Sequence, residues 1–578
     1  MLAVRLNDVL AALDEFERGA LLALVVAPGV GLAVAAVDSA AIAYACVDPC
    51  RVVSEIETEL RPRWVMWSGE TTSALIAAGV RVATSWDIAA VHRLLFGGWQ
   101  ADPARVWALT RDLSLDAVPV ESPIDLFHQG DDSAPDAITD AGHLHPSWAT
   151  GGWARDVDRL ARWASLAATV AQEQQRLLAE PDVSPRSMLT ARSESTIELL
   201  CTELAADGLP VRRAAAEEAI ASVIGPRPRS HADAEDGRRE RDLAVLRHVS
   251  SADDIDLRSP GQVKSLLRRA GIEVPDTRAW RLREMQDVHP VVAALLAWRK
   301  AERVATTYGY AWLDQNVAAD GRLRGAWSGC DGAAGRMTAS AGLHNMPADM
   351  RGAVVAEPGH VFVRADLGQI EPRVLAVVSG DKALVAATQD DDLYAPIAAQ
   401  LGVDRAIAKV AFLGAMYGQT TGRGAQVAGR LETTYPTAMG YLRDADRAAQ
   451  GGRSLRTFGG RLISVGSTNA HDVSERDHRR IAASRGRYGR NAMVQGAAAE
   501  LFKLWAVIVR ARGATINARI VLCLHDELLV HVPEERGENA AQLVNDALAE
   551  AVHRWAPGGA ARFVAEVSVI TRWSEAKR

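Results

Sequence analysis

The chain has 578 residues, of which 48% are hydrophobic and 24% are charged, and its formal net charge is −7. This composition excludes a disordered or fibrous protein and a protein coated in positive charge, although a local basic channel is compatible with it. The length predicts three or four domains.

The N-terminal region raises the question of a membrane segment, because residues 19–37 are uncharged. Pro28, Gly29 and Gly31 lie in the middle of this stretch, which favours two buried strands joined by a turn. Acidic residues precede it, so it lacks the basic leader of a secretion signal. The five cysteines show no zinc-site spacing and indicate free thiols. We therefore predict a cytoplasmic protein that does not enter a membrane.

Taken in chain order, the patterns change character several times. The first part, to about residue 180, mixes short apolar runs with helical patterns and predicts an α/β domain. The polar stretches 130–145 and 225–242 have little periodicity and are predicted as loops or linkers. Over residues 257–317 apolar residues recur at helical spacing, which predicts a helical arm. After Gly325 strands and tight loops are expected, and no internal repeat indicates a solenoid.

Two distant segments place acids at the tips of buried strands. Residues 360–366 form an apolar run that ends in Asp366, and residues 520–532 predict two strands with His525, Asp526 and Glu527 at the turn. A carboxylate in such a place is costly to desolvate unless a cation or hydrogen bonds compensate it. Each segment is a candidate metal site, although most acidic turns are simply solvated.

Between these segments, steps of four place Arg405, Lys409, Leu413 and Tyr417 on one face of a predicted helix. Two cations and an aromatic ring suit a triphosphate and a base. The alternative is a surface helix whose Arg and Lys are merely solvated.

Taken in this order, the three segments resemble the polymerase motifs of the family A DNA polymerases, the bacterial DNA polymerase I type. The matching stretches are Asp366-Leu-Gly-Gln-Ile-Glu-Pro-Arg373, the helix from Arg405 to Gly418, and His525-Asp-Glu527. Supporting segments are Gly335-Arg336, Leu343-His-Asn345-Met-Pro347 and the stretch 487–496. The resemblance covers about residues 255–578 and is weak upstream.

The fold that this resemblance implies is a multidomain α/β protein, with a right-hand polymerase preceded by an RNase H-like exonuclease-type domain. The expected parts are a degenerate 3′-5′ exonuclease-like domain (1–175), a helical thumb (176–308), a palm in two pieces (309–375 and 487–578) and fingers (376–486).

The resemblance also implies roles for single residues. Asp366 and Asp526 would hold two Mg²⁺ ions, or Mn²⁺, with Glu527 as a supporting acid. Lys409 and Arg405 would hold the incoming triphosphate, and Lys409 could protonate the pyrophosphate.

For sugar and template, the resemblance implies that Glu371 collides with the 2′-hydroxyl of a ribonucleotide. Tyr417 would stack at the template base and His525 would lie at the primer end. Gln369 and Leu413 complete the expected nucleotide site. The Arg-rich stretch 476–490 could meet template phosphates or be merely solvated. The expected DNA-binding residues are Arg336, Asn345, Arg461, Arg487, Asn491 and Gln495.

The chain also departs from the family pattern. Thr71 and Ala167 stand where the proofreading acids would be, so the exonuclease-like domain is expected to be inert, and a 5′ nuclease domain is expected to be absent. Leu413 stands where an aromatic residue is usual, and Pro372 replaces an apolar residue. The short interval before Arg405 implies smaller fingers.

The predicted function is template-directed DNA synthesis by a nucleotidyltransferase that acts as a monomer. Its expected partners are primed DNA and deoxynucleoside triphosphates, in repair or replication gap filling near the nucleoid. Three alternatives remain: a bifunctional enzyme with a working 3′-5′ exonuclease, a catalytically retired DNA-binding scaffold, and a single-subunit RNA polymerase. Glu371 and the His-Asp-Glu triplet disfavour the last.

Overall fold

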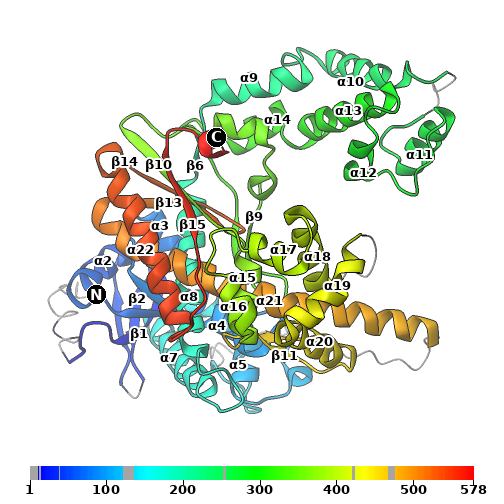
Figure 1. Cartoon of the computed structure of the whole chain (residues 1–578). Coiled ribbons are helices and arrows are strands. Elements are labelled where there is room, and N and C mark those ends of the chain that lie inside the picture. Colours follow the sequence, from blue (N-terminus) through cyan, green and yellow to red (C-terminus); the bar gives the residue numbers. More distant parts are fainter. Residues whose placement is uncertain are drawn as a thin grey trace. The chain divides into compact units, whose positions relative to one another are not determined.

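Figure 1 shows the computed structural model of the whole chain. Its contacts divide the chain into two units. Unit 1 comprises residues 1–207, 326–338 and 363–569, and unit 2 comprises 208–325, 339–362 and 570–578. The residues that the structure describes are 11, 13, 15–37, 39–120, 136–250, 255–418, 423–466 and 475–577. The five predicted domains divide the chain more finely than these units and stay a proposal.

A five-stranded mixed sheet, in the order β3-β2-β1-β4-β5, forms the N-terminal part of unit 1. Strand β1 pairs antiparallel with β2 and parallel with β4. Because successive side chains of a strand point to opposite faces, Ala23 and Val25 pack with helix α7, whereas Leu22 and Leu24 pack with α2. The α/β prediction and the two strands within 19–37 are confirmed. The bounds are Leu21–Ala27 (β1), Gly31–Ala35 (β2), Ile42–Ala45 (β3), Pro49–Leu60 (α2), Arg63–Met66 (β4), Gly69–Ala77 (α3), Thr84–Asp87 (β5), Ile88–Phe96 (α4), Pro103–Thr110 (α5), Pro146–Ala149 (α6), Val157–Leu178 (α7) and Ser187–Asp207 (α8).

A second sheet has the strand order β13-β14-β10-β15, which makes β10 a central strand. Strands β13 and β14 form an antiparallel hairpin with His525 and Asp526 between them, and helix α22 packs on β14 and on helix α21. The predicted strand over 360–366 and the predicted hairpin over 520–532 are confirmed. The bounds are Trp327–Asp331 (β8), Arg336–Ala339 (β9), His360–Leu367 (β10), Glu475–Gly513 (α21), Arg519–Leu524 (β13), Glu527–Pro533 (β14), Gly537–Trp555 (α22) and Ala565–Ile570 (β15).

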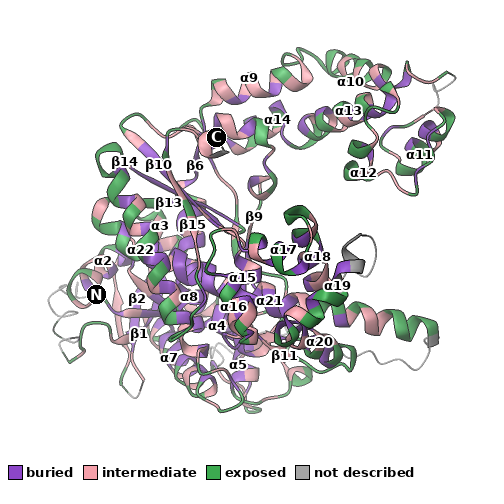
Figure 2. Cartoon of the chain, in the orientation of Figure 1, coloured by how far each residue is buried: buried purple, intermediate pink, exposed green. Residues whose placement is uncertain are grey.

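Helix α21 is exposed over residues 476–480 and mostly buried from Ala492 onward (Figure 2). By length and composition alone it could cross a membrane, with a mean hydropathy of 1.5 over its most apolar window. However, 83% of that window is buried inside the protein, as in the core helix of a globular fold. Among the described residues, no other helix meets the same criteria.

The remaining part of unit 1 is a helical layer with its own core, which includes Leu375, Ile397, Phe412 and Leu442. The buried carboxylate of Asp381 starts two of these helices, because it accepts hydrogen bonds from Leu384 N at 3.1 Å and from Ala438 N at 3.0 Å. The helix predicted over 405–417 is confirmed. The bounds are Ile370–Ser379 (α15), Lys382–Ala387 (α16), Tyr394–Leu401 (α17), Arg405–Tyr417 (α18), Arg423–Thr434 (α19), Pro436–Gln450 (α20), Leu455–Arg456 (β11) and Leu462–Ile463 (β12).

Unit 2 is mainly helical, which confirms the helical arm predicted over 257–317. Its core contains Val263, Leu267, Leu295 and Trp298. The bounds are Leu209–Pro210 (β6), Arg213–Ile224 (α9), His231–Leu246 (α10), Pro260–Arg269 (α11), Ala279–Glu284 (α12), Pro290–Thr307 (α13), Tyr310–Asn316 (α14), Arg322–Leu323 (β7), Leu343–Asn345 (η3), Ala348–Ala353 (η4) and Trp573–Lys577 (η7).

The loop predicted over 225–242 is wrong from residue 231 onward, where helix α10 begins. The Ser230 side chain caps this helix by accepting a hydrogen bond from Asp233 N at 3.1 Å. Only Val245 and Leu246 of α10 are buried. Because the helix buries so few side chains, its sequence needs no apolar stripe and shows no helical periodicity. In the other predicted loop, 130–145, residues 130–135 lie outside the described residues, and an isolated bridge joins Ile138 to Leu144.

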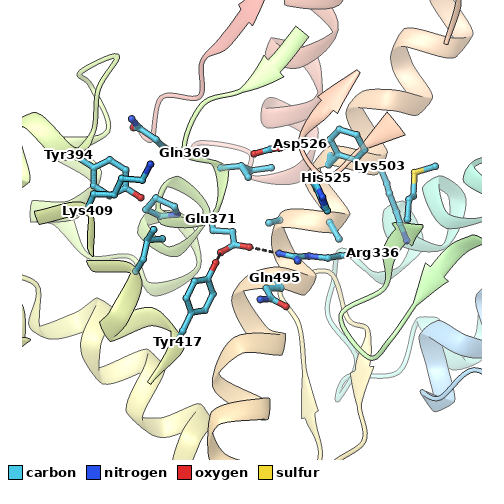
Figure 3. A pocket seen from close by; sticks show the side chains of 17 residues that line it. Arg336, Gln369, Glu371, Tyr394, Lys409, Tyr417, Gln495, Lys503, His525 and Asp526 are labelled. Atoms are coloured by element: carbon cyan, nitrogen blue, oxygen red, sulfur yellow. Dashed lines mark hydrogen bonds and ion pairs between the residues drawn. The ribbon is translucent and has the colours of Figure 1, made fainter. Parts of the chain in front are cut away.

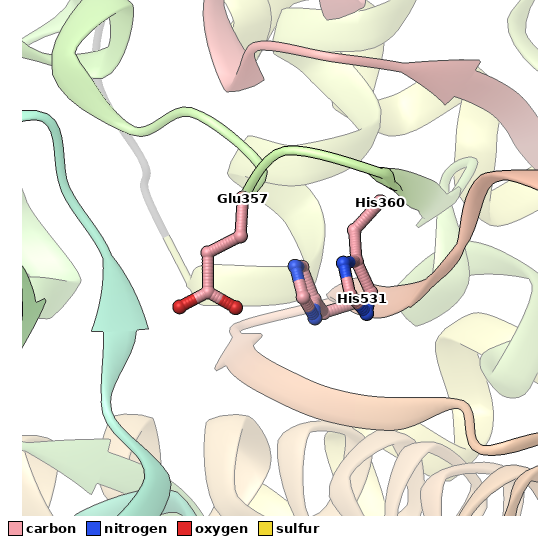
Figure 4. Close-up of side chains that lie close together, drawn as sticks. All are labelled: Glu357, His360 and His531. Atoms are coloured by element: carbon pink, nitrogen blue, oxygen red, sulfur yellow. The ribbon is translucent and has the colours of Figure 1, made fainter.

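The segment that enters β10 is anchored in unit 2. His360 is the first residue of this strand, and Glu357 lies in the segment before it (Figure 4). The carboxylate of Glu357 is bound by Arg322, with 2.7 Å between Nη2 and Oε2. Arg322 also donates to the Gly208 carbonyl oxygen at 3.1 Å.

Candidate active site

The two predicted metal ligands lie in segments that touch. Asp366 is the penultimate residue of β10, and Asp526 lies in the turn between β13 and β14. A backbone hydrogen bond of 2.9 Å from Leu367 N to Asp526 O joins the end of β10 to this turn. Glu527, the first residue of β14, is buried. The fold therefore brings Asp366 close to the adjacent acids Asp526 and Glu527, which lie far away in the sequence.

The charge on this cluster of acids suits a divalent cation. Burial raises the pKa of Asp526 to about 6, and the negative charge of Asp366 adds to the shift. Carboxylates that repel each other are stabilised by a cation between them, and carboxylate oxygens are the donors that Mg²⁺ prefers. Asp366 and Asp526 therefore fit a divalent metal site as its protein ligands.

One cation of the protein already lies among these acids. The guanidinium of Arg364, on β10, donates from Nε to Glu527 Oε1 at 3.0 Å and from Nη2 to Asp366 Oδ2. Its Nη1 lies 3.8 Å from Glu566 Oε2 on β15. The Arg364 side chain is only 2% exposed.

Helix α18 presents its predicted face as one surface. Lys409, Leu413 and Tyr417 line a single pocket. At the start of the helix, Arg405 and Lys409 both lie over the ring of Tyr394, at 5.9 and 6.0 Å from its centroid. Residues spaced four apart therefore lie on one face of α18, as predicted.

The pocket has a volume of about 360 Å³ and lies within unit 1 (Figure 3). In this view Lys409 and Tyr394 lie on one side, Asp526 and His525 on the other, and Glu371 between them. The pocket is lined by Arg336, Met337, Gln369, Ile370, Glu371, Pro372, Tyr394, Lys409, Leu413, Tyr417, Gln495, Ala498, Ala499, Phe502, Lys503, His525 and Asp526. Nine of the residues predicted from the sequence are therefore gathered around one cavity.

Glu371 is held from two sides (Figure 3). Its Oε2 accepts a hydrogen bond from the Tyr417 hydroxyl, and its Oε1 forms an ion pair with Arg336 Nη2. Burial, followed by the bond to Glu371, raises the pKa of Tyr417, so this hydroxyl stays protonated and can donate. The Glu371 side chain is thereby fixed in the middle of the pocket.

Two residues of the site have a left-handed backbone that is uncommon outside glycine. Gln369 has a φ of +57° immediately before α15, and His525 has a φ of +55° in the β13–β14 turn. Gln369 is fixed by its side chain, which accepts a hydrogen bond from Leu393 N and donates one to Asp392 Oδ1, both at 2.8 Å. Such conformations cluster at functional sites, where the surrounding structure holds them.

Arg405 is engaged by an acid in this structure. Its Nη2 lies 3.1 Å from Asp392 Oδ1, and its Nε also donates to the Asp392 carboxylate. An anionic ligand of Arg405 would therefore compete with Asp392.

The predicted DNA-binding residues occupy several different positions. Gln495 lines the pocket, Arg487 is exposed on α21, and the Asn491 amide can donate to the Arg487 and Met416 carbonyl oxygens at 3.3 Å. Asn345 is exposed in unit 2, in the turn η3.

Arg461 requires a correction. It is 2% exposed, its Nη2 lies 2.8 Å from Glu194 Oε1, and its Nη1 donates to Cys330 Sγ at 3.2 Å. A guanidinium buried in this way has no surface for a DNA phosphate, so its role becomes that of a buried ion-pair partner.

Sequence reasoning missed four residues in or beside the site: Arg364, Tyr394, Asp392 and Lys503. For two of them a signal was present, because Arg364 and Lys503 are single charges inside apolar runs. Lys503 is 1% exposed and its Nζ lies 2.7 Å from Glu194 Oε2. No periodic pattern marks Tyr394 or Asp392.

Tryptophans pack together in the N-terminal part of unit 1, where the resemblance to family A implies an exonuclease-like domain. Trp67 stacks on Trp163, with ring centroids 4.4 Å apart, and Ala167 is completely buried on the same helix. Among the described residues of this part, no three His, Cys, Asp or Glu side chains lie close enough together to hold a metal ion.

Comparisons with known proteins identify the family of the chain. The model of DNA polymerase family A matches residues 238–575. DNA polymerase I of Chloroflexus aurantiacus is 33% identical over 297 residues, which cover 46% of this chain and 31% of that protein. The thermostable DNA polymerase I of Thermus aquaticus is 30% identical over 303 residues, or 47% of this chain and 35% of that protein. The match thus spans about a third of these relatives.

The fold has a counterpart among solved structures. The POL domain of Pol1 from M. smegmatis, solved in complex with DNA primer-template and dNTP, superposes with a TM-score of 0.70 over the full length of both chains, at 21% identity. Since the family model covers more than half of the sequence, the chain belongs to DNA polymerase family A.

Proposed function

We propose that this protein is a template-directed DNA polymerase that adds deoxynucleotides to a primer 3′ end. The observation that carries the proposal is the single pocket in which Asp526, Glu371 and Lys409 meet from three separate segments. Family membership and the DNA and dNTP bound by the M. smegmatis relative support it.

Asp366 and Asp526 are proposed as the ligands of two Mg²⁺ or Mn²⁺ ions. When bound, such ions would lower the pKa of the primer 3′-hydroxyl and neutralise charge on the triphosphate and pyrophosphate. The backbone hydrogen bond from Leu367 N to Asp526 O joins the two segments that carry these carboxylates.

The cations of α18 are proposed to bind the incoming triphosphate. Lys409 is exposed at the pocket and can give a proton to the departing pyrophosphate. Arg405 would exchange the carboxylate of Asp392 for a phosphate when the nucleotide arrives.

The other residues of the pocket are proposed to select the sugar of the nucleotide and to contact the template. Glu371 would exclude the 2′-hydroxyl, Leu413 would face the sugar, Tyr417 would lie at the template base and His525 at the primer end. Arg336, Asn345, Arg487, Asn491 and Gln495 are proposed as DNA contacts, with the exposed Arg-rich end of α21 nearby in sequence.

At the level of the chain, we propose the thumb, palm and fingers over the ranges expected from the sequence, behind an inert exonuclease-like part at 1–175. We also propose a monomer that acts in the cytoplasm at the nucleoid, in repair or gap filling.

Primer extension tests this function directly. A labelled primer on a longer template, with Mg²⁺ and four deoxynucleotides, should grow to template length, and omission of one nucleotide should stop it at the matching template base. A protein that binds the primed DNA without extending it would contradict the proposal and leave the scaffold alternative.

A further inference from the structure

Arg364 is a cation buried at the centre of the acid cluster. Because side chains two residues apart on a strand share a face, Arg364 and Asp366 lie on the same face of β10. The neighbouring strands contribute Glu527 from β14 and Glu566 from β15. One guanidinium thus meets acids from three adjacent strands.

The contacts differ in strength. Nε donates to Glu527 Oε1 at 3.0 Å, and Nη2 donates to Asp366 Oδ2, so the planar fork joins these two carboxylates. Glu566, at 3.8 Å, has a 75% exposed side chain and adds little. Glu527 is 8% exposed, and the positive charge of Arg364 compensates its negative charge at 3.0 Å.

We propose that Arg364 is a positioning residue that orients Asp366 and Glu527 and acts as a protein-supplied cation, setting how tightly the acid cluster binds divalent metal. The inference rests on the proposed function for its kinetic part only.

The charges explain the expected effect. Asp366, Asp526 and Glu527 supply three carboxylates, and Arg364 compensates one of them. Removal of the guanidinium charge should strengthen metal binding, because repulsion between Arg364 and the metal disappears. It should also slow extension, because the Asp366 carboxylate loses the bond that orients it. Tighter metal binding together with a slower reaction is not expected of a residue that only stabilises the fold.

The experiment measures Mn²⁺ binding to the full chain without DNA or nucleotide, by electron paramagnetic resonance of free Mn²⁺, and single-turnover primer extension at saturating Mg²⁺. Arg364→Gln should bind Mn²⁺ about tenfold more tightly than the wild type and extend the primer on the order of 10²-fold more slowly. Arg364→Lys keeps the charge but loses the fork. It should bind Mn²⁺ within about twofold of the wild type and extend about tenfold more slowly.

Arg519→Gln is the matched control, since it removes the same charge from the exposed far end of β13. It should change neither quantity. Equal Mn²⁺ affinity in wild type and Arg364→Gln, or undiminished extension by either Arg364 variant, overturns the inference. If Arg364→Gln does not fold, as judged by circular dichroism, the extension rate of Arg364→Lys decides. If the wild type itself does not extend a primer, the proposed function fails, while Mn²⁺ affinity still tests the role of Arg364 as a cation.

Discussion

The carboxylate of Glu371 is held by two side chains of the pocket, Tyr417 and Arg336. We predict that Glu371→Ala relaxes the exclusion of ribonucleotides by about 100-fold or more, because the side chain that the 2′-hydroxyl would strike is gone. The measurement is the ratio of incorporation efficiencies for a ribonucleotide and its deoxynucleotide. Glu371→Gln keeps the volume and should retain most of the exclusion. An unchanged ratio in the alanine variant would show that Glu371 does not face the sugar.

Leu413 lies one helical turn beyond Lys409 and lines the same pocket. Leucine offers no hydroxyl that could replace the missing 3′-hydroxyl of a dideoxynucleotide, so we predict strong rejection of dideoxynucleotides by the wild type and efficient chain termination by Leu413→Tyr. Leu413→Phe, which adds the ring alone, is the matched control and should terminate poorly.

Lys409→Ala is the contrasting variant in the same assay, because it should lower the incorporation rate of every nucleotide by a similar factor. If Leu413→Tyr terminates no more readily than the wild type, the face of α18 is assigned wrongly.

At the scale of elements, α21 carries a buried acid that links it to the β11–β12 hairpin. Glu500 accepts hydrogen bonds from the Thr457 hydroxyl and from Gly459 N at 2.8 Å, and burial raises its pKa from about 4.5 to about 7. An acid with a raised pKa in the folded state stabilises the fold fully below pH 4.5, and this contribution is lost as the pH rises through 7.

We therefore predict that the stability of the wild type relative to Glu500→Gln falls by up to about 3 kcal/mol between pH 4.5 and 7.5. Thermal unfolding midpoints of both proteins across this range give the comparison. A difference that stays constant with pH contradicts the titration of Glu500.

Elements with local patterns could be predicted, and those stabilised from a distance could not. The face of α18 and the acids at the ends of β10 and β13 follow from spacing within a few residues. Helix α10 was missed because a polar helix carries no apolar period. Arg364 and Arg461 were missed or misassigned because their partners, Glu527 and Glu194, lie far away in the sequence.

For the whole molecule, the resemblance to family A identified the region around the site. The N-terminal α/β domain was predicted from its short apolar runs and helical patterns alone. The stack of Trp67 on Trp163 could not be foreseen, because it joins the end of β4 to the middle of α7. The stack packs α7 against the segment that follows β4.

We predict that the protein has no 3′-5′ exonuclease activity. Thr71 and Ala167 offer no carboxylate at the positions where the resemblance to family A implies the proofreading acids. A 3′-labelled primer incubated with Mg²⁺ and no nucleotides should stay intact for hours. Shortening from the 3′ end that persists in Asp366→Asn would place an active nuclease in the chain.

The central claim is that Asp366 and Asp526 act as one metal-binding unit in nucleotide addition. The most direct measurement is metal-dependent extension of a primed template by Asp366→Asn, Asp526→Asn and the double variant, with DNA binding followed by fluorescence anisotropy. Asp546→Asn, an exposed acid on α22, is the control. We predict that each single variant loses extension by on the order of 10³-fold while it still binds DNA, and that the double variant loses little more, because either ligand alone is insufficient. Robust extension by the double variant would contradict the account.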